Sequence, residues 1–224
     1  MRKIIYHGSE NIIIKPSFSM GNSANDFGKG FYCTEEVELA KEWACKKNSN
    51  GFANCYEIDM DGLIVLNLNS GEYNILNWLA LLTKYRSYWQ EKSIAWQAKE
   101  FLQEHYFVDI SGADIVVGYR ADDSYFSFAQ DFIMGTISLQ KLSRAMQLGR
   151  LGEQIVIKSE QAFERLKYQG NEIALADEYY IKKATRDSEA RKEYHDVKHA
   201  SDYSKDIFIV DILRGRVSAD DLRI

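Results

Sequence analysis

Two short segments near the start of the 224-residue chain hold the residues best suited to chemistry. The first is Tyr6-His7-Gly8-Ser9, at the end of an apolar run that predicts a strand. A histidine can exchange a hydrogen bond with a sugar hydroxyl, and a glycine, which has no Cβ, lets a planar amide approach the backbone. Taken alone, this segment is more typical of a turn with an ordinary histidine, so its functional interpretation depends on the second segment.

The second segment runs from Asp26 to Thr34 and has the sequence DFGKGFYCT. Gly28 and Gly30 predict a tight backbone path that ends at Tyr32, and their spacing differs from that of a phosphate-binding P-loop. Trp43 follows on the apolar face of a predicted helix. It is either a core residue or a second aromatic wall that, together with Tyr32, sandwiches a flat ring.

Together these residues resemble the diphtheria-toxin and poly-ADP-ribose-polymerase branch of the ADP-ribosyltransferase superfamily. Its signature is a His-Gly-Ser or His-Gly-Thr segment, a Gly-Lys-Gly-aromatic-Tyr segment and a glutamate on a later strand. His7 and Tyr32 match the first two in order and context. Trp43 falls where the family has its second stacking aromatic, and Ala40 replaces a serine that binds the carboxamide. The resemblance implies an enzyme that uses NAD as a co-substrate, releases nicotinamide and transfers ADP-ribose to a target.

By this resemblance, the nicotinamide would lie between Tyr32 and Trp43, with its amide on the Gly8 backbone and its ribose accepting a hydrogen bond from His7. Tyr32 is therefore expected both to bind NAD and to take part in catalysis. No metal is needed, since the leaving group is part of the substrate. The resemblance implies the following NAD-binding residues: His7, Gly8, Ser9, Phe27, Gly28, Gly30, Tyr32 and Trp43.

The third signature position has two candidates. The segment that begins Glu153-Gln154 and continues Ile-Val-Ile is similar to the family's Glu-x-Ile-Val-x strand, which aligns Glu153 with the catalytic glutamate. The chain also resembles a bacterial family of unknown function in the same superfamily, over residues 6–34, 114–123 and 154–166. That family has a glutamine here, which favours Gln154. Neighbouring strand residues face opposite sides of a sheet, so only one of the two can point into the cleft.

The choice between these two residues decides the chemistry. The carboxylate of Glu153 could stabilise the oxocarbenium-like cation that forms as the nicotinamide bond breaks. The amide of Gln154 could orient the ribose but supplies no charge. If Gln154 points inward, Asp122 or Asp123 could supply the carboxylate, although capping of the following helix is the simpler role for at least one of them.

Composition excludes several other classes of protein. The net charge is −5, with acidic and basic residues interspersed, so no basic stripe indicates binding to nucleic acid by counterion release. The three cysteines, Cys33, Cys45 and Cys55, lack the spacing of a zinc site, and no metal is expected. Since we find no signal peptide and no long apolar run, we expect a cytoplasmic protein without a membrane partner.

The pattern of apolar residues predicts an α+β fold. We expect strands over residues 3–6, 53–60, 63–68, 114–118 and 153–158, and helices over 34–47, 73–106, 122–134, 138–148, 159–166 and 177–199. The resemblance implies a split two-sheet ADP-ribosyltransferase-like core with a helical insertion at 73–106. Residues 1–170 would form this catalytic domain. Residues 171–224, with an apolar run at 207–213, would form an appendage that packs on the core or binds a partner.

The resemblance extends to partners and biological role. The acceptor of ADP-ribose would be a macromolecule, either protein or nucleic acid. Compact members of the superfamily include bacterial effectors, toxins of toxin–antitoxin pairs and phage-defence toxins, so an antitoxin or inhibitor protein is an expected partner. Two alternatives stay open. One is a catalytically silent NAD or ADP-ribose-binding module with Gln154 in place of the acid, and the other is an NAD glycohydrolase in which water replaces the macromolecule.

Overall fold

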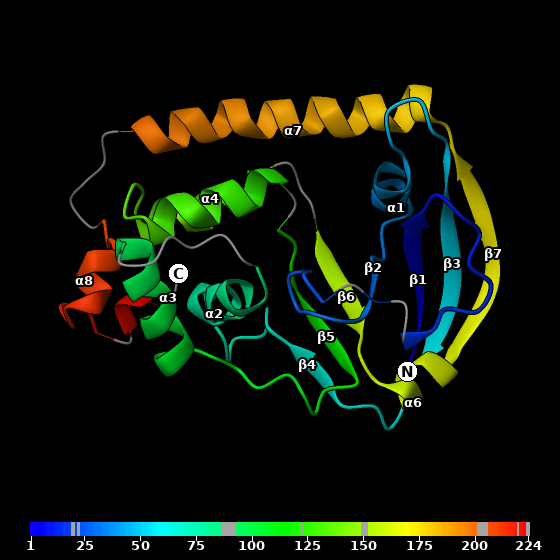
Figure 1. Ribbon diagram of the computed structural model, residues 1–224, viewed down its shortest axis with the longest axis horizontal. Helices are drawn as coiled ribbons and strands as arrows, with labels where there is room; N and C mark the ends of the chain where they lie inside the picture. Colours follow the sequence, from blue (N-terminus) through cyan, green and yellow to red (C-terminus); the bar gives the residue numbers. More distant parts are fainter. Residues whose placement is uncertain are drawn as a thin grey trace.

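The computed structural model describes residues 1–18, 21, 23–86, 93–121, 123–148, 152–200, 206–218 and 220–222, apart from the side chains of Asp123 and Asp220. Within these residues two β-sheets lie next to each other, and helices surround them (Figure 1). The mixed α+β class predicted from the sequence is thereby confirmed.

The three-stranded sheet has the strand order β1-β3-β7 and is antiparallel throughout. It consists of β1 (Arg2–Ser9), β3 (Gly51–Asp59) and β7 (Leu166–Ala174). In β1, Tyr6 also exchanges two backbone hydrogen bonds with Thr34, with N···O distances of 2.7 and 2.9 Å. This bridge joins β1 to the end of β2 in the second sheet and so brings the two sequence motifs side by side.

The four-stranded sheet has the order β2-β6-β5-β4. Its strands are β2 (Phe31–Cys33), β6 (Glu153–Ile157), β5 (Ile115–Tyr119) and β4 (Val65–Asn67), of which only the β4–β5 pair is parallel. Apolar side chains from both sheets form one buried cluster, which includes Ile5, Phe31, Tyr56, Ile58, Ile115, Ile155 and Ile157. Burial of this cluster, worth about 1.5–3 kcal/mol for each large side chain, holds β2 against β1.

Helices cover the sheets and form a second apolar core beside them. On the strand side, α1 (Val37–Ala44) packs on β1 and β3, and the short α6 (Glu160–Glu164) follows β6. The predicted helical insertion contains α2 (Ile75–Tyr85) and α3 (Ile94–His105). Together with α4 (Asp123–Ile133), α5 (Leu139–Ala145) and α8 (Ile209–Leu213), these helices bury the largest side chains of the second core, which include Trp78, Tyr125, Phe128 and Phe132.

Of the helix starts expected from the sequence, those at Ser138 and Ser159 are confirmed and the one at Thr34 is wrong. The Oγ atoms of Ser138 and Ser159 accept hydrogen bonds from backbone N–H groups of the first turns of α5 and α6, at 3.3 and 3.1 Å. By contrast, α1 begins at Val37 and not at Thr34. The backbone of Thr34 is committed to its bridge with Tyr6, so the helix can start only after it.

The sequence predicts a helix through Leu166, and this prediction is wrong. The helix α6 ends at Glu164, and β7 begins at Leu166 as the third strand of its sheet. One face of β7 is exposed, and Gly170, with φ of 141°, interrupts its alternation opposite a register shift in β3. These features hide the strand in the sequence. The domain boundary expected after residue 170 therefore falls inside a strand.

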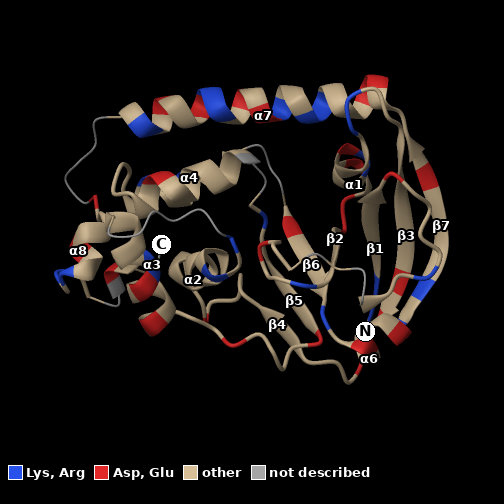
Figure 2. Cartoon of the chain, in the orientation of Figure 1, with Lys and Arg blue, Asp and Glu red and all other residues tan. Residues whose placement is uncertain are grey.

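The C-terminal segment shares the core of the rest of the chain. The long helix α7 (Ala176–His199) crosses the molecule from β7 to the helical side, and acidic and basic residues alternate along it (Figures 1 and 2). The apolar run at 207–213 contains the helix α8. Its Ile209 and Ile212 are buried in the second core. No helix in the described part of the chain is both long and apolar enough to cross a membrane.

Candidate functional site

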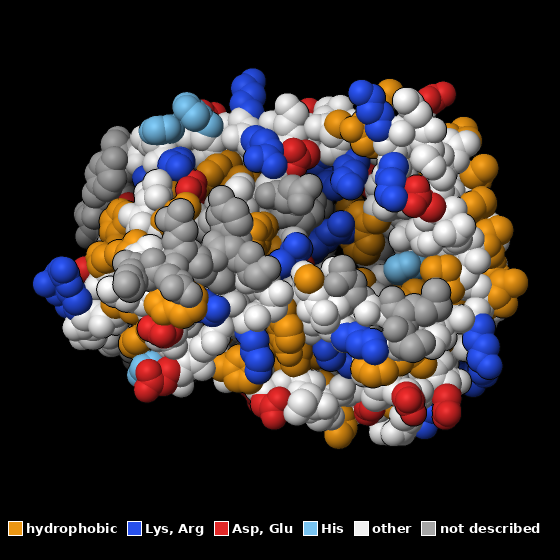
Figure 3. All heavy atoms as spheres, viewed as in Figure 1, with side chains coloured by type: hydrophobic (Ala, Val, Ile, Leu, Met, Phe, Trp, Pro, Cys, Tyr) orange, Lys and Arg blue, Asp and Glu red, His pale blue; other side chains and the backbone are white. Residues whose placement is uncertain are grey.

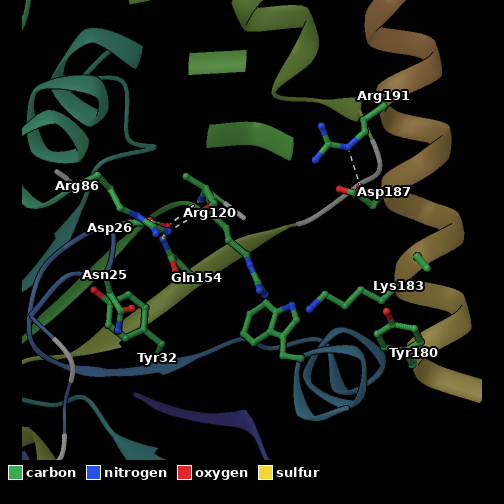
Figure 4. Close-up of a pocket in the computed structure, with 13 residues that line it drawn as sticks. Asn25, Asp26, Tyr32, Arg86, Arg120, Gln154, Tyr180, Lys183, Asp187 and Arg191 are labelled. Atoms are coloured by element: carbon green, nitrogen blue, oxygen red, sulfur yellow. Dashed lines mark hydrogen bonds and ion pairs between the residues drawn. The ribbon is translucent and has the colours of Figure 1, made fainter. Parts of the chain in front are cut away.

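A cavity of about 570 Å³ lies where the four-stranded sheet, α1, the end of α2 and α7 meet (Figure 4). A smaller cavity of about 230 Å³ adjoins it, and Asn25 and Tyr32 line both. The larger cavity is lined by Asn25, Asp26, Tyr32, Trp43, Arg86, Arg120, Ala121, Gln154, Tyr180, Lys183, Ala184, Asp187 and Arg191. It therefore contains three of the sequence-predicted site residues, Tyr32, Trp43 and Gln154, while His7 and Gly30 line the smaller cavity.

His7 is held as a neutral ring with a defined orientation. Its Nδ1 lies 2.7 Å from the carbonyl oxygen of Tyr32, and its ring stacks on Phe31 with centroids 4.2 Å apart. Burial lowers the pKa of the imidazole below its usual value. Since a carbonyl only accepts, Nδ1 carries the proton and Nε2 is left as an acceptor. The ring would therefore accept a hydrogen bond from a ribose hydroxyl, whereas the sequence interpretation has it donate.

Gly8 lies where the backbones of β1 and α1 are in close contact. A Cβ at this position would clash with the carbonyl oxygen of Ala40 and would lie 2.8 Å from the backbone nitrogen of Ala44. The backbone N–H and C=O of Tyr6 point away from β3 and bond to Thr34. In an antiparallel pair, every second residue of a strand directs these groups to the same side, so the N–H and C=O of Gly8 also point away from β3. Ser9, by contrast, lines neither cavity, and its Oγ accepts a hydrogen bond from the N–H of Asn11.

The glycine-rich loop fixes the ring of Tyr32. The Tyr32 hydroxyl donates to the carbonyl of Gly28 at 2.6 Å and accepts from the N–H of Phe27 at 3.0 Å. The ammonium group of Lys158 donates to the carbonyls of Phe27 and Lys29 at 2.7 and 2.8 Å. Burial raises the pKa of Tyr32, so its hydroxyl stays protonated. Phe27 and Gly28 therefore shape the loop, and Tyr32 presents a ring face and not an acid or base.

Replacing Tyr32 by phenylalanine should separate these two roles. We expect a loss of about 1–3 kcal/mol in the free energy of unfolding, since Gly28 and Phe27 lose their partner, with the ring still in place. Tyr32→Ala should lose the ring as well and abolish stacking of a ligand. Denaturant unfolding and ligand titration of both variants test this. Equal ligand affinity in Tyr32→Ala and Tyr32→Phe would contradict the assignment of Tyr32 as an aromatic wall.

Trp43 is the second aromatic residue of the larger cavity. The guanidinium carbon of Arg120 lies 3.6 Å from the centre of the Trp43 ring, which is a cation–π contact. The indole Nε1 is buried and has no acceptor among the residues that the structure describes. A flat ligand ring would therefore stack on the other face of Trp43 or displace the Arg120 guanidinium.

Of the two rival residues on β6, Gln154 faces the cavity and Glu153 faces outward. Gln154 is 3% exposed, and its Nε2 donates to a carboxylate oxygen of Asp26 at 3.0 Å and to the carbonyl of Tyr119 at 2.8 Å. Glu153 is exposed and accepts a hydrogen bond from Asn69 at 2.7 Å. Because both Nε2 hydrogens are used, only Oε1 of Gln154 remains to meet a ligand. Asp122 and the side chain of Asp123 lie outside the described residues.

Asp26 is a site residue that sequence reasoning missed. It is buried, and its Oδ1 accepts two hydrogen bonds from Arg86, at 2.9 and 2.7 Å. Its Oδ2 accepts from the N–H of Ala121 at 2.9 Å and from Gln154. The Asp26 carboxylate thus ties together the loop, the end of α2, the link after β5 and the start of β6. Nothing in the linear sequence marks this network, because Arg86 stands 60 positions from Asp26.

The helix α7 forms a further wall that sequence reasoning did not assign to the site. Its lining residues recur with helical spacing along one face: Tyr180, Lys183, Ala184, Asp187 and Arg191. This spacing is the signal that could have found them. Among the lining residues that the structure describes, four side chains are cationic and two are carboxylates, which gives them a net charge of +2 in a chain of net charge −5. The cavity therefore favours an anionic ligand.

The fold and site define a two-sheet α+β protein with a ring-lined, cationic cavity. Residues 3–168 match the profile of a family described as "Protein of unknown function (DUF3990)", and the chain belongs to this family. The matched range includes both motifs and β6 and ends within β7, so α7 lies beyond it. Searches of curated proteins and of solved structures found no match to this chain.

Proposed function

We propose that the protein is an ADP-ribosyltransferase that binds NAD in this cavity and transfers ADP-ribose to a macromolecular acceptor. One observation carries the proposal: two aromatic rings, Tyr32 and Trp43, line a single cavity whose net charge is positive. A ligand with a flat ring and phosphate groups, such as a dinucleotide, fits this combination. The smaller adjoining cavity with His7 extends the space available to such a ligand.

The placement of the two motifs supports the same proposal. The Tyr6–Thr34 bridge sets the His-Gly-Ser segment beside the Gly-Lys-Gly-Phe-Tyr segment. The N–H and C=O groups of Gly8 point to the side of β1 away from β3, where they could exchange two hydrogen bonds with a carboxamide. His7 could accept from a ribose hydroxyl through Nε2. Each of these contacts corresponds to one that the resemblance implies for NAD, with the direction of the His7 bond reversed.

The proposed reaction breaks the bond between the nicotinamide nitrogen and C1′ of the ribose. The electron pair of that bond leaves with nicotinamide, and the resulting ribosyl cation is captured by a nucleophile of the acceptor, which then gives up its proton. Gln154 could steady the ribose through Oε1. Of the described carboxylates that line the cavity, Asp26 is paired with Arg86 and Asp187 with Arg191. Charge stabilisation of the cation would therefore rest on the Gln154 dipole, which is weaker than a carboxylate.

This arrangement also favours a second candidate function. A cavity that binds NAD or ADP-ribose but presents an amide where the family has a glutamate would suit a binding module without turnover. The specific observation is that Gln154 faces inward while the exposed Glu153 faces away.

A cytoplasmic bacterial toxin or defence effector, paired with an antitoxin, is the biological role that the resemblance suggests for the transferase.

The test of function follows labelled NAD in the presence of a cell lysate. Nicotinamide release and transfer of label should be measured together for the wild-type protein, Tyr32→Ala and Gln154→Ala, with Glu153→Ala as the matched control on the opposite face of β6. Label on a macromolecule that depends on Tyr32 and Gln154, but not on Glu153, is the expected result. Release without label would indicate a glycohydrolase. Binding without release would support the silent module, and neither binding nor release would overturn both candidates.

A further inference from the structure

Lys183 and Lys182 are neighbours on α7 with different surroundings. Lys182 is an exposed residue whose ammonium group pairs with Glu178 at 2.7 Å and Glu38 at 3.3 Å. Lys183 is half-buried, lines the larger cavity and has no ion pair or hydrogen bond with any residue that the structure describes. A lysine that is partly withdrawn from water without a counter-ion is costly unless a ligand supplies one. The ammonium group of Lys183 is therefore available to a ligand in the cavity.

A second cation approaches from the opposite wall. Lys183 extends from α7 toward the tip of Arg120, which lies on the link after β5 (Figure 4). In the space-filling view, Lys and Arg side chains gather below α7 around the middle of this face (Figure 3). The two carboxylates that line the cavity are already paired, Asp26 with Arg86 and Asp187 with Arg191. Lys183 and Arg120 thus bring two positive charges toward the same part of the cavity, which favours an anion there.

The wall that carries Lys183 is held rigidly at both ends. Near its start, the Tyr179 hydroxyl donates to Glu38 at 3.1 Å, and Arg186 donates two hydrogen bonds to Glu42 of α1, at 2.9 and 2.7 Å. Near its end, Tyr194 and Lys198 both bond to one carboxylate oxygen of Asp131, at 2.6 and 2.7 Å. Since these contacts order α7 before any ligand arrives, only the tip of Lys183 would need to be fixed on binding.

We propose that α7 is the phosphate-binding wall of the site, in which Lys183, with Arg120 opposite it, binds the diphosphate group of the ligand. This inference rests on the proposed function for the identity of that ligand as NAD or ADP-ribose. It adds a chemical assignment for a helix that lies beyond the range matched to the family. It also explains why the cavity lining is positive in an acidic chain.

The test compares Lys183→Gln with Lys182→Gln, which remove the same charge one position apart. Titration calorimetry with ADP-ribose, inorganic diphosphate and nicotinamide riboside separates binding of phosphate from binding of the ring. We expect Lys183→Gln to weaken ADP-ribose and diphosphate by about tenfold or more, since a charge-assisted hydrogen bond is lost, and to leave the riboside unchanged. Lys182→Gln should change each affinity by less than about twofold, as is usual for exposed pairs.

The outcomes separate this inference from the proposed function. Binding of ADP-ribose that is equal in Lys183→Gln and wild type would overturn the phosphate wall while leaving NAD binding intact. Diphosphate binding that depends on Lys183, in a protein that binds neither NAD nor ADP-ribose, would support the wall and overturn the NAD proposal. Equal weakening by both lysine variants would overturn the wall, since only a long-range charge effect would then remain. Thermal unfolding of each variant checks that the fold is retained.

Discussion

Replacing Gln154 by glutamate is expected to lower the free energy of unfolding by about 3–5 kcal/mol at neutral pH, because it buries a charge without a partner. In the wild-type protein the Gln154 amide donates to Asp26 and to the Tyr119 carbonyl, and both of these groups only accept. A glutamate would place a second carboxylate about 3 Å from that of Asp26, and Arg86, which already pairs with Asp26, would have to serve both. The network around Asp26 is therefore built for an amide at position 154.

The pH dependence of this loss has a definite sign. Repulsion by the Asp26 carboxylate raises the pKa of the introduced carboxyl above the value of about 4.3 that a glutamate has in the unfolded chain. Between the unfolded and the raised pKa, the folded variant binds more protons than the unfolded one, so its stability falls as the pH rises. The difference from wild type should be small near pH 4 and largest above pH 7. Chemical denaturation of both proteins across this range measures it.

Two matched variants complete the test of the amide. Gln154→Met removes the hydrogen bonds without adding charge, and its smaller loss, about 1–3 kcal/mol, should not vary with pH. Glu153→Gln exchanges a carboxylate for an amide on the opposite face of β6. Its free energy of unfolding should stay within about 0.5 kcal/mol of wild type. A Gln154→Glu protein that is as stable as Glu153→Gln at pH 7 would show that the Asp26 network does not require an amide.

Replacing Gly8 by alanine should be the most damaging change to the strand motif. The added Cβ would clash with the carbonyl of Ala40 and crowd the backbone at Ala44, and neither backbone group can rotate away. We expect a loss of about 3 kcal/mol in the free energy of unfolding, at the upper end for overpacking, and a displaced α1. Trp43 lies on α1, so its position in the cavity and its contact with Arg120 would change as well.

Gly71→Ala is the control for this prediction. A Cβ at Gly71 meets nothing within 4 Å, and its backbone does not require the left-handed region. Near-neutral stability of Gly71→Ala beside a large loss in Gly8→Ala, by thermal and chemical unfolding, is the expected pattern. Tryptophan fluorescence should shift only in Gly8→Ala. If both alanine variants unfold like wild type, then close packing of β1 on α1 is not the reason for a glycine in the motif.

Local features of the site could be predicted from the sequence, because neighbouring residues determine them. Short-range geometry determines the first strand, the helix starts at Ser138 and Ser159, and the rule that only one of Glu153 and Gln154 faces inward. Which of the two faces inward depends on the pairing of β6 with β5, where Gly118 lies opposite Gln154. Because that pairing joins segments far apart in the chain, the sequence alone does not decide between Glu153 and Gln154.

The parts that could not be predicted depend on contacts between distant segments. Asp26 meets Gln154 across 128 positions, and no pattern along the chain connects them. The strand β7 stays hidden because it is an edge strand with polar residues and a glycine irregularity. The helix α7 was predicted almost to its bounds, yet its charges indicate an ordinary solvated surface until the fold places one face of it on a cavity.

The order of the cavity walls along the chain also sets the order in which they are synthesised. Tyr32, Trp43 and Gln154 all leave the ribosome before α7, whose cavity face ends at Arg191. A nascent chain that stops before α7 lacks Lys183 and the other residues with which that helix lines the cavity. Translation thus delays assembly of the complete cavity lining until the cavity face of α7 has emerged.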